Sequence, residues 1–156
     1  MKKVFALLAV SALLLTGCGE KEMSASSDNL PTVTTNQGEA PTIGAPEGNP
    51  PTTLVTKDII VGSGAEALPT STMTVHYTLM TWSNGQLIES SWNGGSPATF
   101  PLANVIVGWQ QGIPGMKVGG RRLLVIPPDL GYGAQGGGPI GPNETLIFVV
   151  DAIGVA

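Results

Sequence analysis

Hydrophobic residues from Leu54 onward fall in short runs, rich in Val, Ile, Leu and aromatic side chains, that are separated by Gly, Pro, Asn and Ser. Runs of this length and composition, bounded by turn-forming residues, are typical of β-strands. Asn84-Gly85 stands between two of the runs and favours a hairpin turn, because both residues tolerate positive φ. The pattern predicts strands over residues 54–61, 72–82, 86–92, 121–126 and 145–153.

One further segment has the period of a helix. Its apolar residues recur with the spacing of a single helix face, which predicts one short amphipathic helix over residues 104–113, ended by Pro114. The strands and this helix together indicate the α+β class, with an antiparallel sheet of five or six strands wrapped over the helix. The apolar positions of the helix are Val105, Ile106, Trp109 and Ile113.

The first eighteen residues have the pattern of an export signal. Lys2-Lys3 precede an apolar run over residues 4–15, which is shorter than the roughly 20 residues of a membrane-spanning helix and fits the apolar region of a signal peptide. The run ends at Leu15-Thr16-Gly17-Cys18, which resembles the bacterial lipoprotein signal, whose cysteine is diacylated and becomes the mature N-terminus. We therefore expect residues 1–17 to be a signal peptide and Cys18 to anchor the protein, outside the cytoplasm, to the bacterial cell membrane. An ordinary signal peptide with an incidental cysteine is the alternative.

The next segment, up to residue 52, is dominated by Ser, Thr, Pro, Gly, Asn and Glu. A segment of this composition buries too little apolar surface to offset the entropy lost on ordering. We expect residues 18–52 to comprise the lipidated cysteine and a disordered linker, and residues 53–156 to form one folded domain. The large apolar residues of the segment are only Met23, Leu30, Val33 and Ile43.

Composition excludes some classes of function. Charged residues make up 12% of the chain, and no basic cluster is longer than Arg121-Arg122, so nucleic-acid binding is not expected. Cys18 is the sole cysteine, which excludes an intramolecular disulfide. The glycine-rich stretch over residues 131–141 lacks the Gly-Lys-Ser/Thr of a phosphate-binding loop.

Short motifs follow one another in a fixed order within the predicted domain. Their order and spacing resemble those of the FKBP-type peptidyl-prolyl cis-trans isomerases, and the resemblance covers roughly residues 54–156. It implies a half β-barrel around the short helix, an active site between helix and sheet, and isomerase activity that needs neither a cofactor nor a metal. The motifs are Val75-His76-Tyr77-Thr78, Gly85 with Ser90-Ser91, Val105-Ile106 with Gly108-Trp109, Gly112 with Met116 and Val118-Gly119, Pro128 with Tyr132-Gly133-Ala134, and Leu146 with Phe148 and Val150.

The resemblance also implies a role for individual residues. Trp109 is the floor under the substrate proline ring, while the Ile106 N–H and the Tyr132 hydroxyl point toward substrate carbonyl oxygens. Ile140 closes one side of the site. The implied catalytic residues are Tyr77, Glu89, Ile106, Trp109, Tyr132 and Phe148, and the implied substrate-binding residues are Ile88, Phe100, Val105 and Ile140.

Three positions depart from the family pattern. Glu89 stands where the family usually has Asp beside the tyrosine, Ile88 where it usually has Phe, and Ala98 where a pocket aromatic is common. These changes leave the floor intact and make the rim smaller, which affects catalytic efficiency more than fold. A solvated turn residue is the alternative interpretation of Glu89. His76 alternates to the face opposite Tyr77 and is interpreted as structural or solvated.

The resulting hypothesis is a lipid-anchored prolyl isomerase, a monomer that assists the folding of exported proteins. Its expected partners are proline-containing polypeptides, tacrolimus-like macrolides and, through Cys18, the membrane. The alternative is a proline-binding chaperone or adaptor module with little turnover. The resemblance implies that Trp109, Tyr77 and Phe148 form one aromatic cup, and an inert β domain is disfavoured because it would give this cup no purpose.

Overall fold

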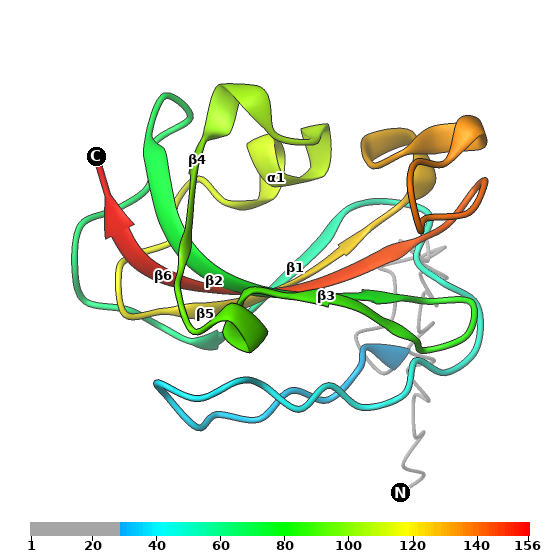
Figure 1. Ribbon diagram of the computed structural model, residues 1–156, viewed down its shortest axis with the longest axis horizontal. Helices are drawn as coiled ribbons and strands as arrows, with labels where there is room; N and C mark the ends of the chain where they lie inside the picture. Colours follow the sequence, from blue (N-terminus) through cyan, green and yellow to red (C-terminus); the bar gives the residue numbers. More distant parts are fainter. Residues whose placement is uncertain (1–28) are drawn as a thin grey trace, which may run out of the picture.

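The computed structural model describes residues 29–156, so the predicted signal peptide and Cys18 lie outside the described residues. This part of the chain is built on one six-stranded antiparallel sheet that curves around a short helix (Figure 1). The strands lie in the order β1-β5-β6-β2-β3, and β4 pairs with the first residues of β2. Their bounds are β1 (Val55–Ile60), β2 (Thr72–Thr81), β3 (Leu87–Ser90), β4 (Ala98–Pro101), β5 (Arg121–Ile126) and β6 (Leu146–Val155).

The observed architecture confirms the predicted α+β class and antiparallel sheet, and all five predicted strands occur. The strand missing from the prediction is β4, which has four residues, ends in Pro101 and has alternate positions exposed, so its sequence carries little of the usual strand pattern. Strand β3 ends at Ser90, two residues before the predicted end, because residues 91–94 form a 3-10 turn. In the hairpin turn only Gly85 adopts a positive φ, at 61°.

The helix is shorter than predicted. Helix α1 spans Val107–Gly112, and Leu102–Asn104 forms a separate 3-10 turn, η3. Between them Val105 and Ile106 are extended, with ψ of 173° and 151°. The prediction merged the turn and the helix because the extended residues are apolar and fall on the same helical period. Two further 3-10 turns, η4 (Pro128–Leu130) and η5 (Gly133–Gln135), lie in the loop before β6.

Helix α1 lies very close to the sheet because two of its residues lack a side chain. A Cβ on Gly108 would stand 2.5 Å from the Ile126 side chain, and one on Gly112 would stand 2.6 Å from Leu124. The carbonyl oxygens of Gly112 and Pro114 accept hydrogen bonds from the Arg122 guanidinium, at 2.9 and 3.3 Å. The end of the helix is therefore tied to β5, which also contributes the apolar surface beneath it.

The expectation of a disordered linker reaching residue 52 is wrong for residues 29–50. These residues, which we call the N-terminal arm, fold against the face of the sheet opposite α1 (Figure 1). The arm doubles back on itself, with Val33 bridged to Ile43. Its apolar side chains Leu30, Val33 and Ile43 pack against a buried cluster of Met80, Trp82, Leu123, Val125, Ile147 and Val149.

Polar contacts fix the arm in place. Arg121 is fully buried and forms an ion pair with Asp151 at 2.7 Å. The same guanidinium donates hydrogen bonds to the carbonyl oxygens of Thr34 (2.9 Å) and Glu39 (2.7 Å). The Trp82 indole N–H donates to the Gly48 carbonyl at 3.1 Å. Backbone groups of the arm thus satisfy polar side chains of the sheet, which would otherwise be buried without partners.

Composition misled the prediction because the arm does not form a core of its own. Its three large apolar residues are too few to fold alone. The second face of the sheet is already apolar, however, because β2, β5 and β6 carry buried side chains on both faces. No helix within residues 29–156 is long and apolar enough to cross a membrane.

The packing of the arm predicts a cost for removing its apolar contacts. The double variant Val33→Ala with Ile43→Ala is expected to lower the free energy of unfolding by about 2–3 kcal/mol, because partly buried methyl groups leave the second face of the sheet. Urea unfolding followed by tryptophan fluorescence measures this change. Ile153→Ala is the control, since Ile153 is 48% exposed on the same sheet and its truncation should shift stability by less than about 0.5 kcal/mol. An unchanged midpoint in the double variant would show that the arm adds nothing to the fold.

Candidate functional site

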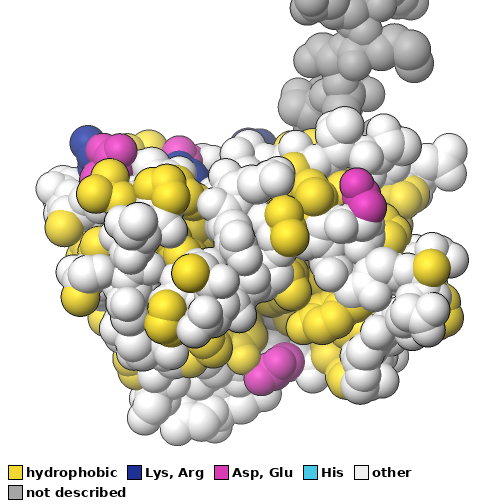
Figure 2. Space-filling model, turned by 90° about the horizontal axis from the view of Figure 1, so that it is seen from above, with side chains coloured by type: hydrophobic (Ala, Val, Ile, Leu, Met, Phe, Trp, Pro, Cys, Tyr) yellow, Lys and Arg dark blue, Asp and Glu magenta, His cyan; other side chains and the backbone are white. Residues whose placement is uncertain are grey.

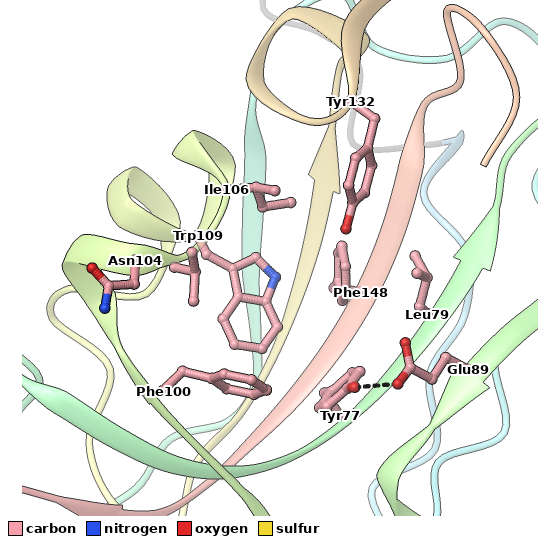
Figure 3. A pocket seen from close by; sticks show the side chains of 10 residues that line it. Tyr77, Leu79, Glu89, Phe100, Asn104, Ile106, Trp109, Tyr132 and Phe148 are labelled. Carbon is pink, nitrogen blue, oxygen red and sulfur yellow. Dashed lines mark hydrogen bonds between the residues drawn. The ribbon is translucent and has the colours of Figure 1, made fainter. Parts of the chain in front are cut away.

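A cavity of about 270 Å³ opens on the helix-bearing face of the sheet, between β2, β6 and the segment that leads into α1 (Figure 3). In the space-filling view this face is hollowed and lined with apolar side chains (Figure 2). The cavity is lined by Tyr77, Leu79, Glu89, Phe100, Asn104, Val105, Ile106, Trp109, Tyr132 and Phe148.

Four aromatic rings form the base of the cavity. The indole of Trp109 is 4% exposed and lies at the centre of the group. Its ring centroid is 5.3 Å from Phe148, 5.8 Å from Tyr77 and 5.9 Å from Phe100. The interplanar angles are 82–90°, an edge-to-face arrangement that stabilises aromatic clusters beyond the burial of their surface. The predicted aromatic cup is therefore present as one shared concavity.

The sheet register brings two of these rings together. Leu79 on β2 pairs with Phe148 on β6, and Tyr77 lies two residues before Leu79. Tyr77 and Phe148 are thus diagonal neighbours on the same face, at a separation that aromatic side chains span. Phe100 comes from β4 and Trp109 from α1, so no stretch of sequence holds more than one of the four rings.

Tyr77 and Glu89 form the polar side of the cavity. The Tyr77 hydroxyl donates a hydrogen bond of 2.7 Å to Oε1 of Glu89 (Figure 3). Burial, and secondarily the neighbouring carboxylate, raises the pKa of Tyr77 well above its usual value. Tyr77 therefore remains a neutral hydrogen-bond donor at physiological pH, and it fixes the orientation of the Glu89 carboxylate. Glu89 is exposed, as the alternative of a solvated turn residue expects, but it lies on strand β3 and not in a turn, and Tyr77 engages its carboxylate.

The segment before α1, residues 104–106, lines one side of the cavity. The Ile106 carbonyl accepts hydrogen bonds from the N–H groups of Trp109 and Gln110. The Gln110 side chain in turn donates to the Val105 carbonyl at 2.8 Å and holds this extended segment against the helix. None of the hydrogen bonds found within residues 29–156 uses the Ile106 N–H as donor. Across the cavity the Tyr132 ring is 41% exposed, and its hydroxyl points into the opening (Figure 3).

Eight of the residues expected at the site from the sequence line the cavity, and two do not. Ile140 is 5% exposed and belongs to the apolar core. Ile88 is partly buried and packs against the same core. The eight that line it are Tyr77, Glu89, Phe100, Val105, Ile106, Trp109, Tyr132 and Phe148.

Two lining residues, Leu79 and Asn104, were not expected from the sequence. Strand alternation from Tyr77 would have indicated Leu79, because residues i and i+2 of a strand share a face. Asn104 gave no such signal, since its place depends on the 3-10 turn η3.

His76, on the other face of β2, is buried, stacks on Trp92 at 3.9 Å and shares a hydrogen bond with Ser91. Its role is structural, as predicted.

The arrangement favours binding over bond-making chemistry. Its floor is apolar, and the polar side chains of its lining are the hydroxyls of Tyr77 and Tyr132, the Glu89 carboxylate and the Asn104 amide. No lining residue is a cysteine, serine, histidine or lysine, so the cavity holds no Ser–His or Cys–His pair of the kind used in covalent catalysis. Burial raises the pKa of the Tyr77 hydroxyl, which makes it a poor nucleophile although it is hydrogen-bonded to Glu89.

Comparison with known proteins agrees with this geometry. A probable FK506-binding protein of Corynebacterium glutamicum is 50% identical over 115 residues, covering 74% of this chain and 98% of the relative. An FK506-binding protein of Streptomyces anulatus is 49% identical over 121 residues, covering 75% and 98%. The crystal structure of FkpA from Escherichia coli superposes with a TM-score of 0.62 at 37% identity, covering 65% of this chain and 47% of that one.

The family model described as FKBP-type peptidyl-prolyl cis-trans isomerase matches residues 64–153, which include α1, strands β2 to β5, most of β6 and all ten residues that line the cavity. The sequence motifs, the curved sheet around one short helix and the aromatic cavity lead to the same family as these relatives. The chain belongs to the FKBP-type peptidyl-prolyl cis-trans isomerases.

Proposed function

We propose that this isomerase accelerates rotation of Xaa-Pro bonds in exported proteins, and that it does so on the outer side of the cytoplasmic membrane, anchored by lipid at Cys18. The observation that carries the catalytic part is the buried indole of Trp109 beneath an open cavity, with three further rings set edge-on around it. The anchoring part rests on the sequence Leu15-Thr16-Gly17-Cys18 after a short apolar run.

The reaction is rotation about the peptide bond that precedes proline, which is slow in water without a catalyst. Resonance gives the peptide C–N bond partial double-bond character and a barrier of about 18–20 kcal/mol. Before proline the cis and trans forms are close in free energy, yet they exchange over tens to hundreds of seconds. In the twisted transition state the resonance is lost, so the imide is less polar than either planar form.

The cavity is suited to bind the twisted form more tightly. Trp109 and Phe148 offer apolar surface to the proline ring and to the imide. Because the twisted imide is less polar than the planar forms, contact with this surface stabilises the twisted form more. We expect the Ile106 N–H and the Tyr132 hydroxyl to hold flanking carbonyl oxygens of a turn-like peptide. Interactions that are stronger in the transition state than in the ground state lower the barrier. No proton moves in the reaction, so the site needs no general base.

Loss of the floor tests the catalytic proposal. Trp109→Leu is expected to lower kcat/KM for short Xaa-Pro peptides at least 10-fold, equivalent to about 1.4 kcal/mol of transition-state stabilisation, because the ring stack beneath the proline is removed. A protease-coupled or NMR exchange assay measures the rate. Trp82→Leu is the matched control, since Trp82 lies in the cluster under the N-terminal arm and its loss should leave kcat/KM within about twofold of the wild type when both proteins are folded.

Two results would contradict the catalytic proposal. Equal rates for wild type and Trp109→Leu would show that the cavity does not perform the reaction. Wild-type binding of proline peptides without any acceleration would favour the adaptor alternative.

The same cavity is expected to bind tacrolimus, which is the FK506 of the names of the two relatives above. Trp109 lies at the base of the cavity, so binding should change the intrinsic fluorescence, with a Kd in the micromolar range or tighter. Tacrolimus should inhibit the isomerase with the same affinity, and Trp109→Leu should lose the fluorescence change. No binding at about 100 μM, a concentration where a ligand worth ~5.5 kcal/mol would register, would contradict an intact ligand site.

The anchor is tested separately from the chemistry. Cells fed labelled palmitate should incorporate it into the full-length protein, and Cys18→Ala should abolish the label and release the protein from the membrane fraction. The isomerase activity of the released protein should be unchanged, because Cys18 lies outside the domain that carries the cavity. An unlabelled wild-type protein in the soluble fraction would refute lipidation.

A further inference from the structure

We propose that Glu89 makes this isomerase selective for prolines flanked by a lysine or arginine, the cationic side chain binding to the carboxylate at the mouth of the cavity. The inference rests on the proposed isomerase function and adds a substrate class to it. It depends on the charge of the cavity, on the unused oxygen of Glu89 and on the hydrogen bond that joins Glu89 to Tyr77, one of the four rings at the base of the cavity.

Glu89 is the sole charged residue among those that line the cavity. Within residues 29–156 the cationic side chains of lysine and arginine are four, and none lines the cavity. Arg121 and Arg122 are engaged by Asp151 and Asp58. Figure 2 shows the basic side chains of this face near its edge, away from the hollow. A cationic substrate side chain at the mouth therefore meets no positive charge of the cavity.

The Glu89 carboxylate retains one free oxygen. Oε1 accepts the Tyr77 hydroxyl at 2.7 Å, while Oε2 takes part in none of the hydrogen bonds or ion pairs found in the described part of the chain. Glu89 is exposed at its place on β3. Its carboxylate is thus held in a fixed orientation by the Tyr77 hydroxyl and has an open acceptor that a lysine ammonium or an arginine guanidinium would satisfy.

The distances allow this contact while a proline occupies the floor. The Tyr77 hydroxyl donates its hydrogen bond to the Glu89 carboxylate, and the Tyr77 ring centroid lies 5.8 Å from that of Trp109. The residues on either side of a proline have their Cα atoms about 3.8 Å from the Cα of the proline. A lysine or arginine stem adds several ångströms and lies favourably along apolar walls while its charged end stays in water. Both neighbouring positions are therefore within reach of Glu89.

The expected selectivity is moderate, because Glu89 is open to solvent. An ion pair in such a place changes binding by about 1.4- to 5-fold. The apolar walls reduce the screening by water on one side, which places the effect toward the upper part of this range. A neutral side chain at this position would not produce it.

The experiment compares matched peptides on the full-length protein. Peptides with lysine, norleucine or glutamate before proline, and a second series with these residues after proline, are assayed for kcat/KM. Lysine and norleucine have stems of similar length and differ in charge. In at least one series we expect kcat/KM to be about 3- to 5-fold higher for the lysine peptide than for the norleucine peptide, and lowest for the glutamate peptide. The preference should be largely lost at about 0.5 M salt, because salt screens charges in solvent.

Variants assign the preference to Glu89. Glu89→Gln is expected to bring the lysine-to-norleucine ratio to about 1, whatever its effect on the overall rate, and Glu89→Lys is expected to favour the glutamate peptide. Tyr77→Phe removes the hydrogen bond but keeps the charge, so it should lower the rate and retain a ratio above 1. Glu66→Gln is the control for net charge, since Glu66 is exposed and outside the cavity, and it should leave the wild-type ratio intact.

The outcomes separate the inference from the proposed function. Equal kcat/KM for lysine and norleucine in both series, with clear catalysis of both peptides, would overturn the selectivity alone. A preference that survives in Glu89→Gln would overturn the role of Glu89. Absence of catalysis with every peptide would overturn the isomerase proposal and this inference together.

Discussion

The close approach of α1 to β5 is the constraint on which the site depends. Gly108 and Gly112 leave no room for a Cβ against Ile126 and Leu124, so the helix lies directly on the sheet and carries Trp109 down to the level of the strand side chains. A helix displaced by even one methyl group would lift the indole away from Tyr77 and Phe148. The floor of the cavity is therefore a consequence of helix–sheet packing, in which two small residues on α1 are as necessary as the aromatic ring they position.

The two faces of the sheet have different roles. Its concave face holds the aromatic cavity, while its other face would be an exposed apolar surface without the N-terminal arm. Arg121 connects the two parts of this arrangement, because its guanidinium joins Asp151 on the central strand β6 to the carbonyl oxygens of the arm. A buried guanidinium requires such a full set of acceptors, since an unpaired buried charge would destabilise the fold strongly. The arm is thus part of the domain although it precedes the residues matched by the family model.

The cavity combines an apolar floor of four aromatic rings with a single charged side chain at its mouth. Rotation of an imide requires a surface that favours a less polar state, and four rings around a small opening provide it. The hydrogen bond from Tyr77 to Glu89 adds orientation and a single negative charge at the mouth. Because the charge lies beside the floor and not in it, it can influence which peptides bind without disturbing the apolar surface on which we propose that the proline ring rests.

The sequence by itself determined the α+β class and five of the six strands, because strand periodicity is a local property of the chain. Its ordered motifs indicated eight of the ten lining residues through their resemblance to a known family. It did not determine that Ile88 and Ile140 turn into the core, that Leu79 and Asn104 reach the cavity, or that residues 29–50 are folded. Each of these depends on which surfaces meet across the sheet. A segment too poor in apolar residues to fold alone becomes ordered when a neighbouring face supplies the missing core and a buried arginine supplies the donors, and only the tertiary structure reveals such a partner.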